Sequence, residues 1–202
     1  MIEYDGICFD SIVIACTEND LPLHKMIRIR EAQKRDSAAI AKVHIDSWRT
    51  TYKGIVSDDY LSVMSYTERE QRWQEFFEDT DHFQFVYLAE EKNGQIVGFA
   101  SAGVNRTEIA DYQGELYAIY ILREYQGKGI GRQLTEAVAR RLLREEIRSI
   151  SVWVLEKNSA CRFYEALGGI KLLEKEINIG NTKLIEVAYG WKDINTLNHI
   201  YQ

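Results

Sequence analysis

Three glycines at alternate positions, Gly127, Gly129 and Gly131, separate a strand-like stretch from an amphipathic helix. Glycine adopts a positive φ without steric cost and lets backbone N–H groups approach a ligand closely. At a helix N-terminus these N–H groups also lie at the positive end of the helix dipole, which favours an anion. The segment therefore predicts either a cradle for a phosphate or pyrophosphate group or a plain tight turn into a helix.

Two common phosphate-binding loops do not fit this turn. A Walker A loop requires Gly-Lys followed by Ser or Thr, but here Gly127-Lys128 is followed by Gly129. A dinucleotide-binding fingerprint that began at Gly127 would need Gly or Ala at the position of Arg132. The strand before the turn is also predicted to be antiparallel, which argues further against a dinucleotide fold.

The hydrophobic period changes several times along the chain, which predicts both helices and strands. Asp36 is a candidate cap for the first helix, and Asn93-Gly94 is a strong hairpin signal. The predicted order is strand 26–31, helices 36–48, 58–64 and 67–78, strands 83–89, 96–104 and 115–122, helix 130–142, strand 149–155, helix 158–167, and strands 170–177 and 183–191. This order predicts an α/β (α+β) single domain with one mixed sheet.

The length of 202 residues is sufficient for one domain with a large core. We expect that domain at residues 26–192. Residues 1–25 are predicted to form an N-terminal extension, either an added edge strand or a segment outside the core fold. Residues 193–202 are predicted to form a C-terminal tail.

Charge and cysteine content exclude several classes of protein. The net charge of −6 argues against a broad nucleic-acid interface, which needs a basic face. The N-terminus lacks the basic start and apolar run of a signal peptide, and no nearby apolar run could span a bilayer. The three cysteines, Cys8, Cys16 and Cys161, have neither metal-ligand spacing nor an even-numbered framework. We therefore expect a cytoplasmic protein with no metal, nucleic-acid or membrane partner.

Two blocks of sequence resemble the GNAT superfamily of acetyl-CoA-dependent N-acetyltransferases. Residues 126–131 read Gln-x-x-Gly-x-Gly, similar to the acetyl-CoA-binding signature of that family, and the strand before them is also similar. Residues 158–168 are similar to its second block, Asn-x-x-Ala-x-x-Phe-Tyr-Glu-x-x-Gly. The resemblance covers about residues 26–191 and is weakest before Phe83. Arg123 replaces a frequent proline and Gly169 a frequent phenylalanine, neither at a position expected to carry chemistry.

The resemblance implies a GNAT-type fold, a mixed and mostly antiparallel sheet flanked by helices, with acetyl-CoA as cosubstrate. Backbone N–H groups of 126–131 would hold the pyrophosphate, and Ile119 and Ile121 would pair with the pantetheine arm like an added strand. The cofactor-binding residues implied are Ile119, Tyr120, Ile121, Gln126, Gly127, Lys128, Gly129, Ile130, Gly131, Arg132, Asn158, Ala160 and Tyr164. Asn158 could equally act as a simple helix cap.

Two residues are candidates for catalysis. Glu115 matches a position that serves as general base in some enzymes of the family, acting directly or through water; the alternative is a solvated carboxylate at a strand end. Tyr164 matches the tyrosine of the second block and could protonate the departing thiolate; the alternative is an aromatic anchor for its helix. Cys161 has no histidine nearby in sequence, so we expect direct acetyl transfer.

The acceptor site is predicted where the first helix breaks among aromatic residues. His44, Trp48 and Tyr52 are candidates for binding the amine, although core packing is the preferred explanation for each one taken singly. Such an aromatic segment favours a small closed pocket, hence a primary amine of a small molecule. Two alternatives are a protein or peptide N-acetyltransferase of the same fold and a non-catalytic CoA-binding sensor module. A homodimer is compatible with the sequence.

Overall fold

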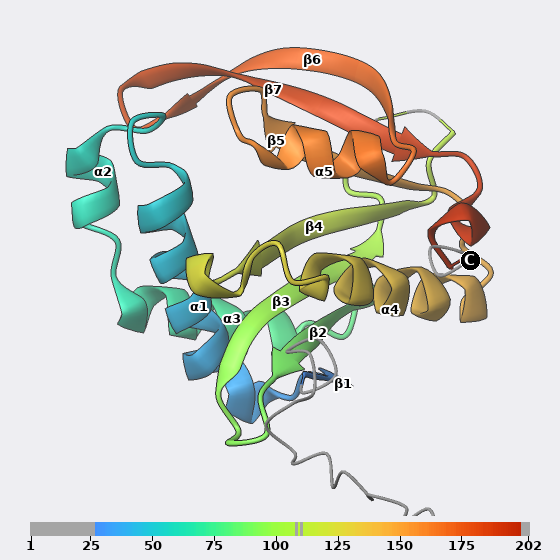
Figure 1. Cartoon of the computed structure of the whole chain (residues 1–202), viewed down its shortest axis with the longest axis horizontal. Helices are drawn as coiled ribbons and strands as arrows, with labels where there is room; N and C mark the ends of the chain where they lie inside the picture. The colour runs from blue at the N-terminus through green and yellow to red at the C-terminus, as the bar shows by residue number, and fades with distance from the viewer. Residues whose placement is uncertain (1–26, 108, 110, 199–202) are drawn as a thin grey trace, which may run out of the picture.

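The alternating residues at 85–89 form a strand that is buried on both faces. In β2 (Gln84–Glu90), Phe85 and Ala89 pack into one core cluster, whereas Val86 and Leu88 pack into another. Successive side chains of a strand point to opposite faces, so a strand that is apolar at every position must be covered on both sides. The computed structural model, which describes residues 27–107, 109 and 111–198, meets this requirement with one sheet between two layers of helices (Figure 1).

In this part of the chain the sheet has seven strands in the order β1-β2-β3-β4-β5-β7-β6. Besides β2, the strands are β1 (Arg28–Glu31), β3 (Ile96–Val104), β4 (Gly114–Ile121), β5 (Ile150–Leu155), β6 (Ile170–Ile179) and β7 (Thr182–Trp191). All neighbours are antiparallel except β4 and β5, which are parallel. The predicted α/β (α+β) fold with a mixed, mostly antiparallel sheet is therefore confirmed.

Helices from two parts of the chain cover the two faces. Their bounds are α1 (Ser37–Thr51), α2 (Asp58–Ser62), α3 (Tyr66–Glu78), α4 (Ile130–Arg144) and α5 (Ala160–Ala166). Ile40 of α1 and Trp73 of α3 pack with Phe99 on one face, while Leu134 and Val138 of α4 pack on the other. Each helix therefore buries its apolar stripe against the sheet.

Asp36 precedes α1 as predicted, but the prediction that its side chain caps the helix is wrong. The carboxylate accepts a hydrogen bond from the backbone N–H of Gln33 at 2.8 Å and pairs with Arg30 at 2.9 Å. Arg30 also binds Glu90 of β2. The hydrogen bonds from Arg30 hold the pKa of Asp36 below its usual value. The carboxylate thus joins β1 to the start of α1 instead of satisfying the helix N–H groups.

The packed domain extends beyond the predicted end at residue 192. Ile194–Asn198 form a 3-10 helix after β7, and Ile194 and Leu197 are buried in the same cluster as Leu142 of α4. Two apolar side chains spaced three residues apart in a 3-10 helix lie on one side of it, which explains why the segment packs instead of remaining a tail. The extension predicted at residues 1–25 and the last part of the predicted tail, 199–202, lie outside the described residues.

The two parallel strands at the centre of the sheet separate soon after they meet. β4 and β5 pair only where Gly114–Leu116 lie opposite Ile150–Val152. Directly after this stretch β4 bulges at Tyr117, because Ala118 pairs with Ser101 of β3 while Leu116 pairs with the next residue along β3. A bulge bends and twists its strand. Beyond it the ends of β4 and β5 diverge, and the space between them is the site described next.

Candidate active site

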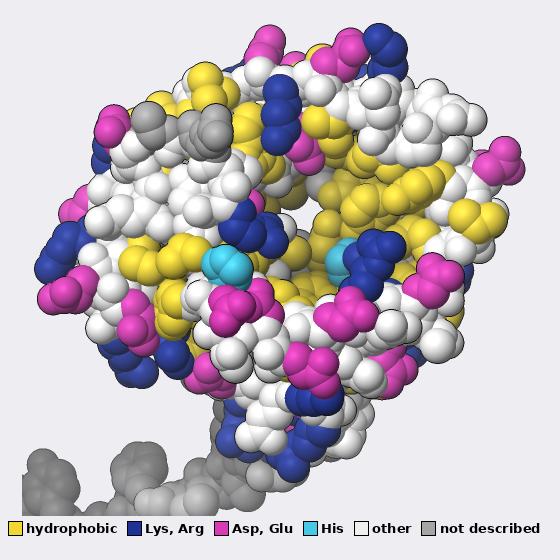
Figure 2. All heavy atoms as spheres, turned by 180° about the vertical axis from the view of Figure 1, so that it is seen from behind, with side chains coloured by type: hydrophobic (Ala, Val, Ile, Leu, Met, Phe, Trp, Pro, Cys, Tyr) yellow, Lys and Arg dark blue, Asp and Glu magenta, His cyan; other side chains and the backbone are white. Residues whose placement is uncertain are grey.

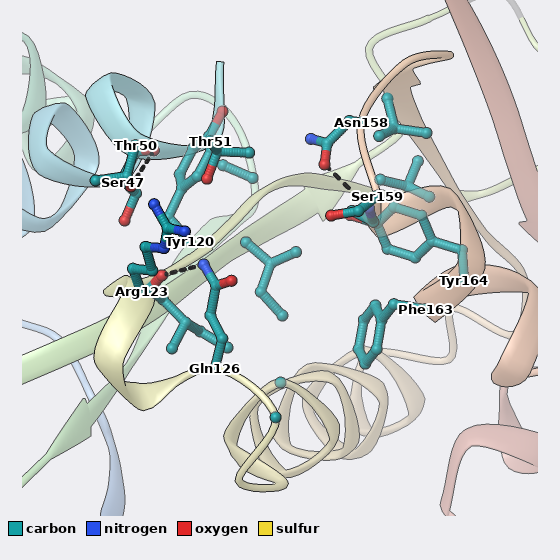
Figure 3. Close-up of a pocket in the computed structure, with 18 of the residues that line it drawn as sticks. Ser47, Thr50, Thr51, Tyr120, Arg123, Gln126, Asn158, Ser159, Phe163 and Tyr164 are labelled. Atoms are coloured by element: carbon teal, nitrogen blue, oxygen red, sulfur yellow. Dashed lines mark hydrogen bonds between the residues drawn. The ribbon is translucent and has the colours of Figure 1, made fainter. Parts of the chain in front are cut away.

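The space between the diverging ends of β4 and β5 is a cavity of about 1090 Å³. Ligand pockets in proteins usually occupy about 300–1,000 Å³, so this one is large enough for a long ligand. Figure 3 shows polar side chains from α1, β4 and the turn facing the start of α5 across the cavity: Ser47, Thr50, Thr51, Tyr120, Arg123 and Gln126 on one side, and Asn158, Ser159, Phe163 and Tyr164 on the other.

The end of β4 presents backbone groups to the cavity. The N–H of Leu122 donates to the carbonyl of Val97 on β3 at 2.9 Å. Alternate residues of an antiparallel strand bond to the same neighbour, so Ile119 and Ile121 turn their N–H and C=O groups away from β3. The carbonyl of Ile121 accepts a hydrogen bond from Nε2 of Gln126 at 2.9 Å. The remaining groups form a strand edge to which an extended ligand with amides can add.

The glycine turn is shaped as a cradle. Gly127 has φ of 72° and Gly129 of 79°, both in the left-handed region that favours glycine. A Cβ atom built on either residue would meet nothing within 4 Å, so the space in front of the turn is open. The first N–H groups of a helix have no partner inside it, and those of α4 begin at this turn. The geometry suits an anionic group such as a pyrophosphate.

The third glycine serves packing more than conformation. A Cβ on Gly131 would lie 3.2 Å from Cζ of Phe163 on α5, which is closer than a normal contact. Ile130 is also directed inward, since its side chain is buried beneath the turn. Only the backbone of Ile130 can therefore contribute to the predicted binding. Lys128 and Arg132 line the cavity and supply positive charge beside the cradle.

Asn158 secures the start of α5 and also lines the cavity. Its side-chain Oδ1 accepts a hydrogen bond from the N–H of Ala160 at 2.9 Å, which secures the start of α5. Its Nδ2 donates to the hydroxyl of Tyr52 at 3.4 Å, and the residue lines the cavity. The amide therefore connects the α5 side of the cavity with the end of α1.

Tyr164 lies in the wall of the cavity, on the same side as Phe163. Its ring is buried and makes an edge contact with Phe163 at 5.4 Å between ring centres. Burial raises the pKa of Tyr164 well above the usual value for tyrosine. The hydroxyl consequently stays protonated at ordinary pH and can donate a proton or a hydrogen bond into the cavity.

Tyr52 and Tyr120 occupy the junction between the cavity and the helices α1 and α2. Both line the cavity, and burial raises the pKa of each hydroxyl. Tyr120 stacks on the imidazole of His44 at 4.8 Å between ring centres. Of the three residues predicted for the acceptor site, only Tyr52 reaches the cavity wall.

His44 and Trp48 lie behind this wall. Burial, with a smaller effect from the positive charge of Arg69, lowers the pKa of His44 to about 3. Nδ1 of His44 is buried and has no hydrogen-bond partner within the described residues. Trp48 packs against Tyr52 at 4.6 Å between ring centres. Both side chains therefore support the wall from behind, as the core-packing interpretation of the sequence expected.

Glu115 is not brought to the cavity wall. It belongs to the paired part of β4, and its side chain is buried. The carboxylate accepts a hydrogen bond from the N–H of Arg106 at 2.9 Å and lies 3.3 Å from the guanidinium of the same residue. The guanidinium in turn covers the ring of Tyr117 at 3.3 Å. A carboxylate held in this way can reach the cavity only through an intervening water or through Tyr117, which lines it.

Several cavity residues were not predicted from the sequence. They are Ser47, Thr50, Thr51, Tyr117, Ala118, Arg123, Val152, Trp153, Val154, Ser159 and Phe163. Phe163 belongs to the second sequence block, so its place in the cavity wall could have been predicted from that block. Ser47 is a buried residue of α1, and no local pattern distinguishes a buried serine in a core from one in a cavity wall. Trp153 lines the cavity where β5 has diverged from β4, and this divergence depends on long-range pairing.

Two further observations concern the same described ranges. No helix there is both long and apolar enough to cross a membrane. No group of three or more His, Cys, Asp or Glu side chains there is arranged to hold a metal ion.

Comparisons with known proteins agree with this geometry. Residues 45–169 match the acetyltransferase (GNAT) family. The chain is 41% identical over 172 residues to the uncharacterized N-acetyltransferase YuaI of Bacillus subtilis (strain 168), covering 85% of this chain and 96% of that protein. It is 22% identical over 165 residues to the spermidine N(1)-acetyltransferase of Thermoplasma acidophilum, covering 81% of this chain and 98% of that one.

The fold is also similar to solved structures. The structure of yncA from Salmonella typhimurium with its cofactor acetyl-CoA superposes with a TM-score of 0.61 at 21% identity. The match covers 82% of this chain and 92% of that chain. At this level of identity the likeness establishes a shared fold.

Proposed function

The chain belongs to the acetyltransferase (GNAT) family and is an N-acetyltransferase, and from this premise we propose that it transfers the acetyl group of acetyl-CoA directly to a primary amine of a small molecule. The observation that carries the proposal is the cavity between β4 and β5, which has a strand edge along one wall and the glycine turn at its end. A chain of amides fits the edge and a pyrophosphate fits the turn.

The residues of this cavity fit acetyl-CoA. In the proposal, backbone N–H groups at Gly127, Gly129 and the first turn of α4 hold the pyrophosphate, with Lys128 and Arg132 adding charge. Ile119 and Ile121 pair with the amides of the pantetheine arm, and Asn158 bonds to the same arm from across the cavity. Bound there, acetyl-CoA supplies an activated thioester. The N–H of Ile119 is directed at the cavity and would stabilise negative charge on the thioester oxygen.

Tyr164 is proposed as the general acid. The reaction forms a bond between the amine nitrogen and the carbonyl carbon and breaks the bond from that carbon to sulfur. The departing thiolate needs a proton, and the hydroxyl of Tyr164 is protonated and lines the cavity. Tyr52, joined to Asn158, lies near enough to the same space to orient the amine.

The amine must lose a proton before or during attack, and Glu115 is proposed to take it through water. The carboxylate is buried against Arg106 and does not line the cavity, so direct contact with the amine is not part of the proposal. Tyr117, two residues along β4 from Glu115, lines the cavity, and its hydroxyl donates to the carbonyl of Val104 at 2.7 Å. Its pKa is raised to about 12, chiefly by burial, so its hydroxyl remains neutral.

The small-molecule acceptor is supported by the way the last hairpin closes one end of the cavity. β6 and β7 reach across to α2 in Figure 1. Leu184 of β7 is buried with Tyr52 and Leu61, and a Cβ on Gly180 would lie 3.0 Å from the ring of Tyr60. A peptide acceptor would need an open groove at this point, whereas these contacts enclose it. The cytoplasmic location and the homodimer stay predictions from the sequence.

A direct test is to incubate the purified protein with acetyl-CoA and separate panels of amino acids, polyamines, aromatic amines and short peptides. Free thiol is followed continuously, and each acetylated product is identified by mass spectrometry. We expect thiol release that depends on a small amine and yields its acetyl derivative. Acetylation confined to peptides would overturn the small-molecule acceptor, and no amine-dependent release with any panel would overturn the proposed reaction.

A further inference from the structure

The charged side chains that line the cavity are all basic. They are Arg123, Lys128 and Arg132, and within residues 27–107, 109 and 111–198 no aspartate or glutamate belongs to the lining. The chain as a whole carries a net charge of −6, so the charge in the cavity has the opposite sign. In Figure 2 acidic side chains lie around the outside of the hollowed face, whose interior is mainly hydrophobic. A cavity of this kind favours anionic ligands.

One of these cations lies away from the glycine turn. Arg123 begins the 3-10 helix Arg123–Tyr125, which follows β4 and packs against α1. Figure 3 shows its side chain extending towards the C-terminal end of α1, where Ser47 and Thr51 line the cavity. Arg123 stands where the GNAT pattern frequently has proline, so the family resemblance predicted no role for it. The structure places it on the acceptor side of the cavity.

No hydrogen bond, ion pair or ring contact engages the guanidinium of Arg123 among the described residues. Lys42 of α1 provides the contrast, because it pairs with Asp46. Asp46 is the acidic residue of α1, and it also accepts a hydrogen bond from the hydroxyl of Tyr66 at 2.6 Å. The helix that Arg123 faces therefore has no unengaged carboxylate. Water alone can balance an exposed arginine, so a second observation is needed to indicate a ligand.

Ser47 supplies that observation. The residue is 1% exposed and lines the cavity, and its Oγ has no hydrogen-bond partner in the part of the chain that the structure describes. A hydroxyl in a helix commonly donates to a carbonyl one turn earlier, as that of Thr50 does to Asp46 at 3.0 Å. A buried hydroxyl that makes no such bond is unfavourable. Because a serine side chain turns about a single bond, Oγ can instead meet a group in the cavity.

We propose that Arg123 and Ser47 bind an anionic group of the acceptor, a carboxylate or phosphoryl group carried by the same small molecule as the reactive amine. This inference rests on the proposed acetyl transfer and specifies its substrate class. The guanidinium matches two oxygens of such a group with two parallel hydrogen bonds, and the hydroxyl of Ser47 donates a third. The amine of a short amino acid-like molecule then extends from α1 towards Tyr164 across the cavity.

The same lining disfavours polyamines. A polyamine is a polycation, and its recognition would need carboxylates, which the described lining of the cavity lacks. The acceptor class proposed here therefore differs from the one named for the relative from Thermoplasma acidophilum, which is 22% identical.

The main test compares each variant with the wild type on matched pairs of acceptors, so that differences in amine basicity cancel. The pairs are L-phenylalanine with its α-amide and O-phosphoethanolamine with ethanolamine, and spermidine is added as a polycation. Arg123→Gln should raise KM for the anionic acceptors by about 10- to 100-fold with little change in kcat, and leave KM for the amide and ethanolamine as it was. Ser47→Ala should raise the same values by about 3- to 10-fold. Arg123→Lys should recover part of the loss.

Arg144→Gln is the control for removal of a surface cation, because Arg144 is exposed and does not line the cavity. It should leave every KM unchanged. An equal loss with the carboxylate and its amide in Arg123→Gln, or a wild type that prefers spermidine in kcat/KM to both anionic acceptors, would overturn the anion site.

Thermal stability shows whether the hydroxyl of Ser47 is structural. Ser47→Ala removes a hydroxyl without a partner in the described residues and should leave the melting temperature unchanged or raise it. Ser37→Ala, also in α1, removes a hydroxyl that donates to the carbonyl of Lys34 at 2.6 Å and should lower it. An equal fall in both variants would remove Ser47 from the site.

Calorimetry separates the acceptor from the donor as the source of the anion. The Kd values of CoA and of 3′-dephospho-CoA are measured for the wild type and Arg123→Gln. The inference expects both values to change by less than about twofold. Binding of CoA weakened by about tenfold or more would assign Arg123 to a phosphate of the donor and overturn the acceptor site.

Equilibrium binding keeps the inference testable if no amine is acetylated. With CoA present, N-acetyl-L-phenylalanine, its amide and N-acetyl-O-phosphoethanolamine are titrated by calorimetry into the wild type and Arg123→Gln. Binding of an anionic probe weakened by about tenfold or more in the variant, with the amide unaffected, would support the anion site even though the proposed reaction had failed. Absent or equal binding of both anionic probes in the two proteins would refute it.

Discussion

The two sides of the cavity present different groups to a ligand. On the β4 side these are backbone groups: the edge at Ile119 and Ile121, and the N–H groups at the glycine turn. On the side of α1 they are side chains, such as Ser47 and Tyr52, whose positions depend on packing between distant segments. Backbone groups are the same for every sequence that keeps the turn and the bulge.

This difference explains how one fold can keep its donor and change its acceptor. A wall made of backbone tolerates most substitutions as long as strand separation and positive φ are maintained. In a wall made of side chains, a single substitution can change which ligand binds. The family therefore identifies the donor, whereas only the particular residues of this chain can identify the acceptor.

The largest expected effect is on the donor side. Gly129→Val places a β-branched residue at φ of 79° and fills the open space of the cradle. Loss of two or more hydrogen bonds to a charged group should weaken CoA binding by more than about 100-fold. Calorimetry measures the binding, and circular dichroism checks the fold.

Gly94→Val is a matched control for this substitution. Gly94 also has a positive φ, 86°, with open space around it, but it lies in the β2–β3 turn away from the cavity. Both variants should lose similar stability from left-handed strain, about 1–2 kcal/mol. If both, or neither, lost CoA binding, the cradle would not be the reason for the glycine at 129.

The next effect concerns Glu115, which belongs to neither wall. Glu115→Gln keeps an acceptor for the N–H of Arg106 but removes the base, so kcat should fall by about 10²–10⁴. The loss should shrink at high pH, where free amine is abundant. The control is Arg106→Gln, which disturbs the same contact and leaves the carboxylate. An equal loss at every pH, matched by Arg106→Gln, would indicate that Glu115 only positions its loop.

Tyr164→Phe should give a smaller loss, about 10² in kcat, because only the proton for the thiolate is removed. The ring contacts with Phe163 are retained, and the Kd for acetyl-CoA should change little. An acyl donor with a more acidic thiol should recover much of the rate. The control is Tyr189→Phe, which removes a hydroxyl bonded to Glu165 from a ring that packs against Tyr164 and does not line the cavity. Full kcat in Tyr164→Phe, with chemistry limiting turnover, would leave Tyr164 a packing residue.

The smallest expected effect is the pH dependence of the free energy of unfolding that His44 contributes behind the acceptor side of the cavity. The pKa of His44 is lowered from 6.5 to about 3, so the unfolded chain takes up a proton below about pH 6.5 and the folded chain does not. Stability contributed by neutral His44 is therefore present above pH 6.5 and lost as pH falls towards 3. Between pH 8 and pH 5 the loss should be about 2 kcal/mol in the free energy of unfolding.

His44→Phe should remove this pH-dependent component, whereas substitution of the exposed His82 by Gln should leave it intact. Denaturant unfolding at pH 5, 6, 7 and 8 measures it. A titration of the His44 imidazole near its usual pKa, observed by NMR, would show that the wall behind Tyr120 is open to water.

Much of the donor side could be predicted from the sequence because its signals are local. Gly127 and Gly129 encode positive φ, residues 158–168 encode a short helix with its cap, and the elements lay within a few residues of their predicted positions. Ile130 shows the limit, since a motif does not reveal that its side chain turns into the core.

The acceptor side was less predictable from the sequence because it depends on how far β4 and β5 diverge and on packing between segments that are distant in sequence. The sequence positions of His44 and Trp48 were compatible with amine binding and with core packing. Which of the two applies depends on the position of β4 beside α1. Asp36 illustrates the same limit, because Arg30 and Gln33 engage the carboxylate that was expected to cap α1.

Hydrogen–deuterium exchange with and without acetyl-CoA tests most directly whether the cavity between β4 and β5 is the donor site. Saturating acetyl-CoA should slow exchange at the amides of Ile119, Ile121 and residues 127–132, and leave the β2–β3 hairpin unchanged. Gly129→Val should show no such protection at the same concentration. Binding by calorimetry with unchanged exchange across residues 119–132 would contradict the account and place the cofactor elsewhere on the protein.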